Sequence, residues 1–317
     1  MTLLESARAV AGASGDGAVD WAAVADAAKA ATAPGDVDLS EAEAEAYAAD
    51  VRDARERLRD VSGMAFDVPD TVEIQNRHHW LDANVGTFRR AFEPLNDRAD
   101  VLPGVARSVN TATTAGALAF VSRHVLGQYD PLLLADGDDH ALYFVHPNIK
   151  RVADELDVAF PRFRRWIAFH EVTHAAEFGA APWLSDYLEA RLEDGVAALS
   201  EGTVRSEAFQ ELNVAMTSVE GYAELLMDEA FDGEYDDLRR KLDARRQGGG
   251  PLAKLFKRAL GFQLKREQYE RGREFFDIVA ADRGLEGASR VWASPEYLPT
   301  DEELDAPELW LARYPAE

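Results

Sequence analysis

The stretch His170-Glu171-Val172-Thr173-His174 decides how we interpret the chain. It lies in a run from Phe163 to Phe178 that contains neither Pro nor Gly, and apolar residues such as Trp166 predict a buried helix there. Positions i and i+4 lie one turn apart on the same helix face, so both imidazoles can reach one metal ion. The pattern is typical of zinc hydrolases, in which the glutamate between the histidines acts as general base.

A histidine pair that only packs a helix would show the same spacing, and chance produces the bare pattern in roughly one chain in a hundred of this length. Zinc in a catalytic site normally has three protein ligands and a water, so a third ligand is needed. We predict Glu220, because Gly221 beside it would let a neighbouring helix approach closely. The alternatives for the third ligand are Glu193, Glu211 and Glu224.

Five further residues are candidates near this site. Glu224 lies one helical turn beyond Glu220 and could accept a hydrogen bond from the outer ring nitrogen of a ligand histidine. Candidates for stabilising an oxyanion are Tyr129, Tyr143 and Tyr222, which the sequence does not rank. His146 lies on a predicted strand before the metal helix and could face the cleft.

The composition limits the partners and the ligand chemistry. The formal net charge is −24, from 58 acidic against 34 basic residues, which argues against nucleic acid or an anionic membrane as the main partner. There is no cysteine, so His and carboxylate remain as metal ligands. No secretory signal and no run of eighteen apolar residues is apparent. We therefore predict a cytoplasmic protein. Its acidic composition indicates a cell with a high-salt cytoplasm, and the alternative is an acidic protein without such an adaptation.

Most of the chain is predicted to be helical. Ser40 and Glu43 form a capping box for a charged helix that Gly63 ends. Further helices are predicted at about 21–33, 76–93, 105–126, 182–198, 206–231 and 263–282, with short helices in a tail from 291 to 317. We expect one domain from residue 70 to the end, with residues 1–69 as a helical segment packed on it.

Two segments interrupt this helical pattern. Residues 129–134 and 141–149 are short apolar runs separated by Ala-Asp-Gly-Asp-Asp, which predicts a hairpin shortly before the metal helix. Residues 239–273 concentrate basic charge around a Gly-Gly-Gly-Pro sequence. This basic stretch is either a mobile arm or a lid that binds an anionic substrate, and the triple glycine favours the arm.

The chain resembles a family of zincin-like hydrolases associated with biosynthesis of the redox deazaflavin coenzyme. The resemblance is carried by the metal motif, by Pro182-Trp183-Leu184, by Glu220-Gly221-Tyr222-Ala223-Glu224, by Gly127-Gln128-Tyr129-Asp130-Pro131, by Trp80 with Asn84, by Gln268-Tyr269-Glu270, and by Val291-Trp292-Ala293-Ser294-Pro295-Glu296. It covers about residue 70 to the C-terminus. Where the family often has His after Glu-Gly, this chain has Tyr222, so a phenol would have to serve as proton donor there.

The resemblance implies a predominantly α, zincin-like fold with a small sheet or hairpin beside the metal helix. We predict that one zinc ion is held by His170, His174 and Glu220, and that Glu171 is the general base. The expected substrate is a peptide or a small molecule with an amide bond. The alternatives are a metal-binding scaffold without activity and a helical protein without metal.

Overall fold

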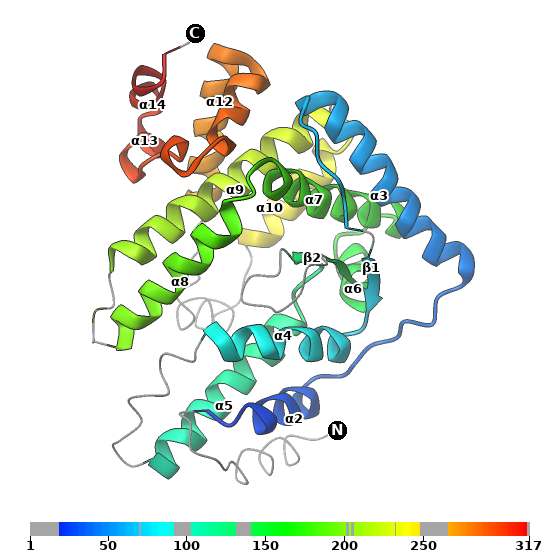
Figure 1. The fold of residues 1–317 in the computed structure, drawn as a ribbon. Helices are drawn as coiled ribbons and strands as arrows, with labels where there is room; N and C mark the ends of the chain where they lie inside the picture. The colour runs from blue at the N-terminus through cyan, green and yellow to red at the C-terminus, as the bar shows by residue number, and fades with distance from the viewer. Residues whose placement is uncertain are drawn as a thin grey trace.

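The computed structural model describes residues 19–69, 71–91, 103–130, 141–200, 203, 206–231, 233–247 and 266–315. Helices dominate, beside one small sheet, as the sequence predicts (Figure 1). The helices are α2 (Trp21–Ala31), α3 (Glu41–Ser62), α4 (Arg77–Ala91), α5 (Pro103–Ser122), α6 (His146–Glu155), α7 (Phe160–Ala180), α8 (Leu184–Ser200), α9 (Glu207–Phe231), α10 (Asp236–Gln247), α12 (Arg266–Ser289), α13 (Asp301–Asp305) and α14 (Pro307–Arg313). None of these described helices combines the length and hydropathy that a bilayer crossing requires.

The ends of α3 follow directly from local sequence. The Ser40 hydroxyl accepts from the backbone N–H of Glu43, and the Glu43 carboxylate accepts from the backbone N–H of Ser40 at 2.9 Å, so the predicted capping box is confirmed. Gly63 ends the helix with φ +66°, a conformation that glycine adopts without steric cost. Tyr47 and Leu58 on the buried face pack into the core with α7.

The three strands are β1 (Thr71–Gln75), β2 (Gly127–Asp130) and β3 (Ala141–Val145), in the order β1-β3-β2. β2 and β3 are antiparallel, with Tyr129 opposite Leu142, whereas β1 is parallel to β3. The predicted hairpin pairing is therefore confirmed for the described part, while residues 131–140 lie outside it. In the view of Figure 1 the sheet lies between α4 and α7.

Two details of the predicted strands were wrong. The second strand ends at Val145 and does not continue to Ile149, because His146-Pro147 begins α6 and proline suits the first turn of a helix. The strand β1 was missed, although its Thr-Val-Glu-Ile-Gln sequence alternates as a half-buried strand does. A parallel partner of β3 cannot be inferred from a hairpin signal, since it comes from a distant segment.

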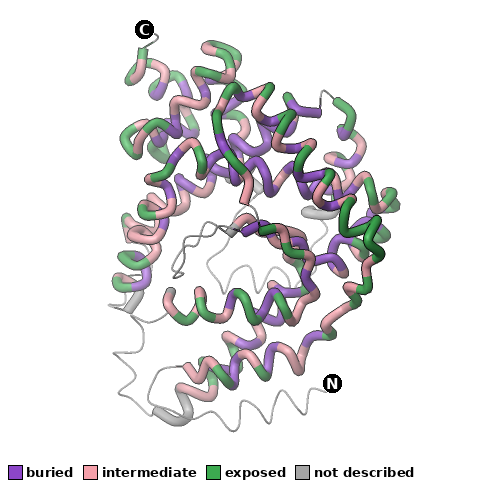
Figure 2. The backbone as a smooth tube through the Cα atoms, turned by 45° about the vertical axis from the view of Figure 1, so that its right-hand side comes forward, coloured by how far each residue is buried: buried purple, intermediate pink, exposed green. Residues whose placement is uncertain are grey.

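Two clusters of buried apolar residues hold the molecule together. The larger cluster joins α3, α7, α9 and α12 through residues such as Leu58, Phe169 and Phe276. The smaller one joins α2, α4 and α5, and includes Trp80 and Leu118. Figure 2 shows the buried faces of the helices turned inward in both parts. The metal motif lies on α7, within the larger cluster.

Helices α9 and α12 cross at two glycines. A Cβ added at Gly221 would lie 2.3 Å from the backbone carbon of Gly272, and one added at Gly272 would lie 2.3 Å from the carbonyl oxygen of Thr217. No side chain larger than hydrogen fits at this crossing. The presence of Gly221 predicted this close approach. The crossing fixes the position of α9 at the residue that follows Glu220.

Gly221→Ala and Gly272→Ala should each destabilise the protein by about 2 kcal/mol or more, because backbone atoms occupy the space that the added methyl needs. Gly86→Ala is the matched control, since Gly86 is exposed on α4 and has nothing within 4 Å of an added Cβ. Alanine is a better helix former than glycine, so this variant should be up to about 1 kcal/mol more stable. Thermal unfolding measures all three, and equal Tm values would contradict the close crossing.

Candidate metal centre

Three side chains from two helices come together beside α7. His170 and His174 lie one turn apart on α7, with ring centroids 4.7 Å apart and planes at 74°. Glu220 reaches them from α9, and the three potential ligand atoms all lie within 4.8 Å of one another. Among the residues that the structure describes, this is the only such group of three or more His, Cys, Asp or Glu. The structure thus gathers the three residues that the sequence predicts as ligands.

The donor set suits a zinc ion. Two imidazoles and one carboxylate are a ligand set of catalytic zinc sites, and a fourth position is then open to water. All three residues are half-buried, so a ligand could still reach them. Trp166, one turn before His170, stacks on its imidazole with centroids 5.7 Å apart and planes at 7°, which fixes the orientation of that ring.

Glu171 follows His170 on α7, and its side chain lies against strand β2. Its side chain is buried, and its Oε2 accepts a hydrogen bond from the backbone N–H of Tyr129 at 3.0 Å. A Cβ added at Gly127 would lie 2.6 Å from Oε1, so a larger residue at this position would displace the carboxylate. Burial raises the pKa of Glu171 to about 7, against the opposing effects of His174 and the Tyr129 amide. A carboxylate with this pKa can exchange a proton near neutral pH.

Glu177 is a functional candidate that was not among the residues predicted from the sequence. Its fully buried carboxylate lies 2.8 Å from Nδ1 of His174, which is three residues earlier on α7. Burial by itself lowers the pKa of His174, but the hydrogen bond with Glu177 and the nearby negative charges outweigh it and raise that pKa. Because Nδ1 is engaged with Glu177, Nε2 is the nitrogen left for a cation. The i, i+3 spacing after the second histidine was the available signal.

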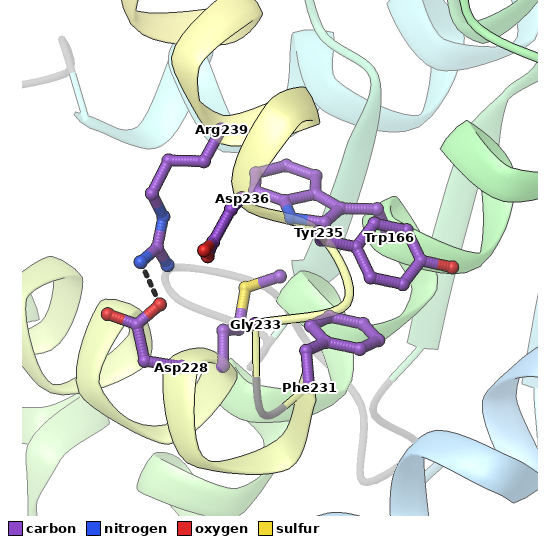
Figure 3. Close-up of a pocket in the computed structure, with 8 residues that line it drawn as sticks. Trp166, Asp228, Phe231, Gly233, Tyr235, Asp236 and Arg239 are labelled. Atoms are coloured by element: carbon purple, nitrogen blue, oxygen red, sulfur yellow. Dashed lines mark hydrogen bonds and ion pairs between the residues drawn. The ribbon is translucent and has the colours of Figure 1, made fainter.

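Glu224 was predicted to accept a hydrogen bond from the outer ring nitrogen of a ligand histidine, but its side chain has another partner. Its carboxylate pairs with Arg239 of α10 at 3.0 Å, and Arg239 also pairs with Asp228. Figure 3 shows this arginine beside a cavity of about 10 Å³. The cavity is lined by Trp166, Met227, Asp228, Phe231, Gly233, Tyr235, Asp236 and Arg239. It has the size of a single water position, which excludes it as a substrate pocket.

The other candidates also have partners away from the ligand group. The Tyr222 hydroxyl is 2.7 Å from the Ser289 hydroxyl on α12, and burial raises the pKa of the phenol. His146 is buried, with Nδ1 3.0 Å from the Tyr47 hydroxyl. The structure therefore directs Tyr222 and His146 to other neighbours. The oxyanion role of Tyr222 and the place of His146 in the cleft stay predictions.

The alternative third ligands lie apart from the histidines as well. Glu211 pairs with Arg191 at 2.7 Å, and Glu193 is exposed on α8. Of the four glutamates considered, the structure brings Glu220 to the histidines.

The described ends of the basic stretch are tied to the body of the protein. Arg271 pairs with Asp301 and Asp305, and Arg273 pairs with Asp228 at 2.7 Å. Residues 248–265, with the triple glycine, lie outside the described residues. Whether the stretch is an arm or a lid stays a prediction.

Comparison with known proteins identifies the class. The family model described as zincin-like metallopeptidase matches residues 19–205 and 192–311, so the chain belongs to this family. A protein of Chloroflexus aurantiacus, described as "a putative hydrolase with a novel fold", has a crystal structure similar to this one, with a TM-score of 0.79 and 31% identity. The match covers 94% of this chain and 99% of that chain. Among curated proteins, none matches.

Glu177→Gln should weaken zinc binding by about tenfold or more, because a neutral amide holds the His174 ring less strongly than a buried carboxylate does. Glu224→Gln is the matched control, since Glu224 pairs with Arg239 instead and should leave the affinity unchanged. Competition with a zinc-binding dye measures both. A larger loss in the control would show that Glu224 is the residue that supports the ligands.

Proposed function

We propose that this protein is a zinc-dependent hydrolase that cleaves a peptide or amide bond. The observation that carries the proposal is the group of His170, His174 and Glu220 with Glu171 on the same helical turn as the histidines. Membership of the zincin-like metallopeptidase family supports it. When bound, zinc would supply Lewis acidity that lowers the pKa of water toward neutrality and polarises the scissile carbonyl.

The chain's own residues would provide positioning and proton transfer. Glu171 would take a proton from the attacking water on a carboxylate oxygen and pass it to the leaving amine. Burial has already raised the pKa of this group to about 7, which suits a group that must both accept and donate a proton. Glu177 would hold His174 in place through Nδ1.

The substrate is proposed by class. The sequence resemblance points to amide-bearing precursors of the deazaflavin coenzyme, and the family points to peptides. The negative formal charge of −24 argues against nucleic acid as a partner. A cytoplasmic location in a high-salt cell stays a prediction from composition.

Glu171→Gln should retain about one zinc per chain and lose roughly 10²- to 10⁴-fold in turnover, because the amide cannot accept the proton from water. His170→Ala should lose the zinc itself, since a ligand is removed. Elemental analysis of protein purified without added zinc measures the metal. A panel of fluorogenic peptides and amide-bearing coenzyme precursors measures turnover.

Each outcome separates one alternative. Wild-type protein without zinc would support a helical protein that binds no metal. Stoichiometric zinc without turnover on any substrate would support the non-catalytic scaffold. Turnover that is equal in Glu171→Gln and wild type would contradict the assignment of the general base.

A further inference from the structure

Strand β2 contacts two different helices through alternate residues. Gln128 reaches α4, whereas Gly127 and Tyr129 on either side of it reach α7. This follows from the period of two along a strand. β2 is an edge strand of four residues, so its position depends on these side contacts as well as on its pairing with β3. The Gly-Gln-Tyr-Asp motif therefore lies between α4 and the general base.

The side chain of Gln128 is held at both ends of its amide. Its Oε1 accepts from the indole N–H of Trp80 at 2.7 Å, and its Nε2 donates to Oδ1 of Asn84 at 2.9 Å. Asn84 in turn donates to the backbone carbonyl of Trp80 at 2.9 Å, and both α4 residues are buried. An indole N–H can only donate, so it fixes which end of the Gln128 amide faces it. The three side chains form one closed network.

The opposite face of β2 contacts Glu171, the proposed general base. The backbone N–H of Tyr129 donates to Glu171, and the Tyr129 ring packs on Phe178 of α7 with centroids 5.4 Å apart. The Cα of Gly127 lies against the same carboxylate. A shift of β2 by about half an ångström away from α7 would lengthen the 3.0 Å hydrogen bond to the greatest donor–acceptor distance at which such a bond still forms.

We propose that Gln128 is a positioning residue for Glu171, an inference that rests on the proposed function. The network of Trp80, Asn84 and Gln128 holds β2 at the distance from α7 at which the Tyr129 amide binds one carboxylate oxygen of Glu171. The general base then has a fixed orientation before substrate binds. This gives the Trp80, Asn84 and Gly-Gln-Tyr-Asp motifs a common role.

Amide hydrogen exchange in the metal-free protein tests the positioning without any substrate. Gln128→Met keeps the side-chain length but removes both hydrogen bonds, and Trp80→Phe removes the indole donor together with part of the buried ring. Each should speed exchange at the Tyr129 amide by about tenfold or more. The double variant should be no faster than Gln128→Met, because both changes break the same contact.

Two references separate a local effect from a general loss of structure. Glu73→Gln is the matched control, since Glu73 lies in the same row of the sheet but on the other edge strand, and it should leave Tyr129 unchanged. The Leu142 amide on β3, opposite Tyr129, is the internal reference. Equal acceleration at Leu142 and Tyr129, or none at either, would overturn the proposal.

Cobalt(II) substitution then reports the protonation of Glu171 itself. The visible spectrum of the cobalt protein is followed against pH, and Glu171→Gln identifies the transition that belongs to Glu171. Gln128→Met and Trp80→Phe should raise its midpoint by about half a pH unit, because an amide donor favours the carboxylate form. Stoichiometric cobalt with an unmoved midpoint would overturn the positioning alone. Failure of wild type to bind cobalt would overturn the proposed function and the positioning with it.

Discussion

Three carboxylates and two imidazoles are gathered between α7 and α9, and the balance of their charges is the constraint on which the site depends. Glu171 and Glu177 are buried, and Glu220 faces both histidines. Burial removes the hydration of Glu171 and Glu177, and the nearby carboxylate of Glu220 repels their negative charge, so the pKa values of both groups are raised. Such a group needs positive charge nearby, and the proposed zinc ion would supply it. Without the zinc ion, bound protons must supply this positive charge.

The surrounding fold holds this group in place from three directions. The close crossing of α9 and α12 at Gly221 and Gly272 fixes the helix that carries Glu220. The stacked ring of Trp166 supports His170 from within α7. The strand β2 presses against Glu171 from the third direction. Each support is a short-range contact, so a small displacement of the supporting residue would also shift the side chains of the site.

The structural similarity extends over nearly the whole chain, to a protein of Chloroflexus aurantiacus with 31% identity. The shared fold shows the class, while the reaction has to be argued from the site. The proposed reaction depends on a ligand group that combines nitrogen and oxygen donors and on a base with a pKa of about 7. Both features concern α7 and its immediate neighbours.

The sequence by itself determined what repeats locally along the chain. It predicted the metal helix, the capping box at Ser40, most helices and the pairing of β2 with β3, because periodicity, caps and turns act over a few residues. Only the tertiary structure decided what depends on distant segments meeting. It added β1, it paired Glu224 with Arg239, and it placed Glu177 beside His174 and the Tyr129 amide on Glu171. The sequence offered four glutamates as third ligand, and helix packing brought Glu220 to the histidines.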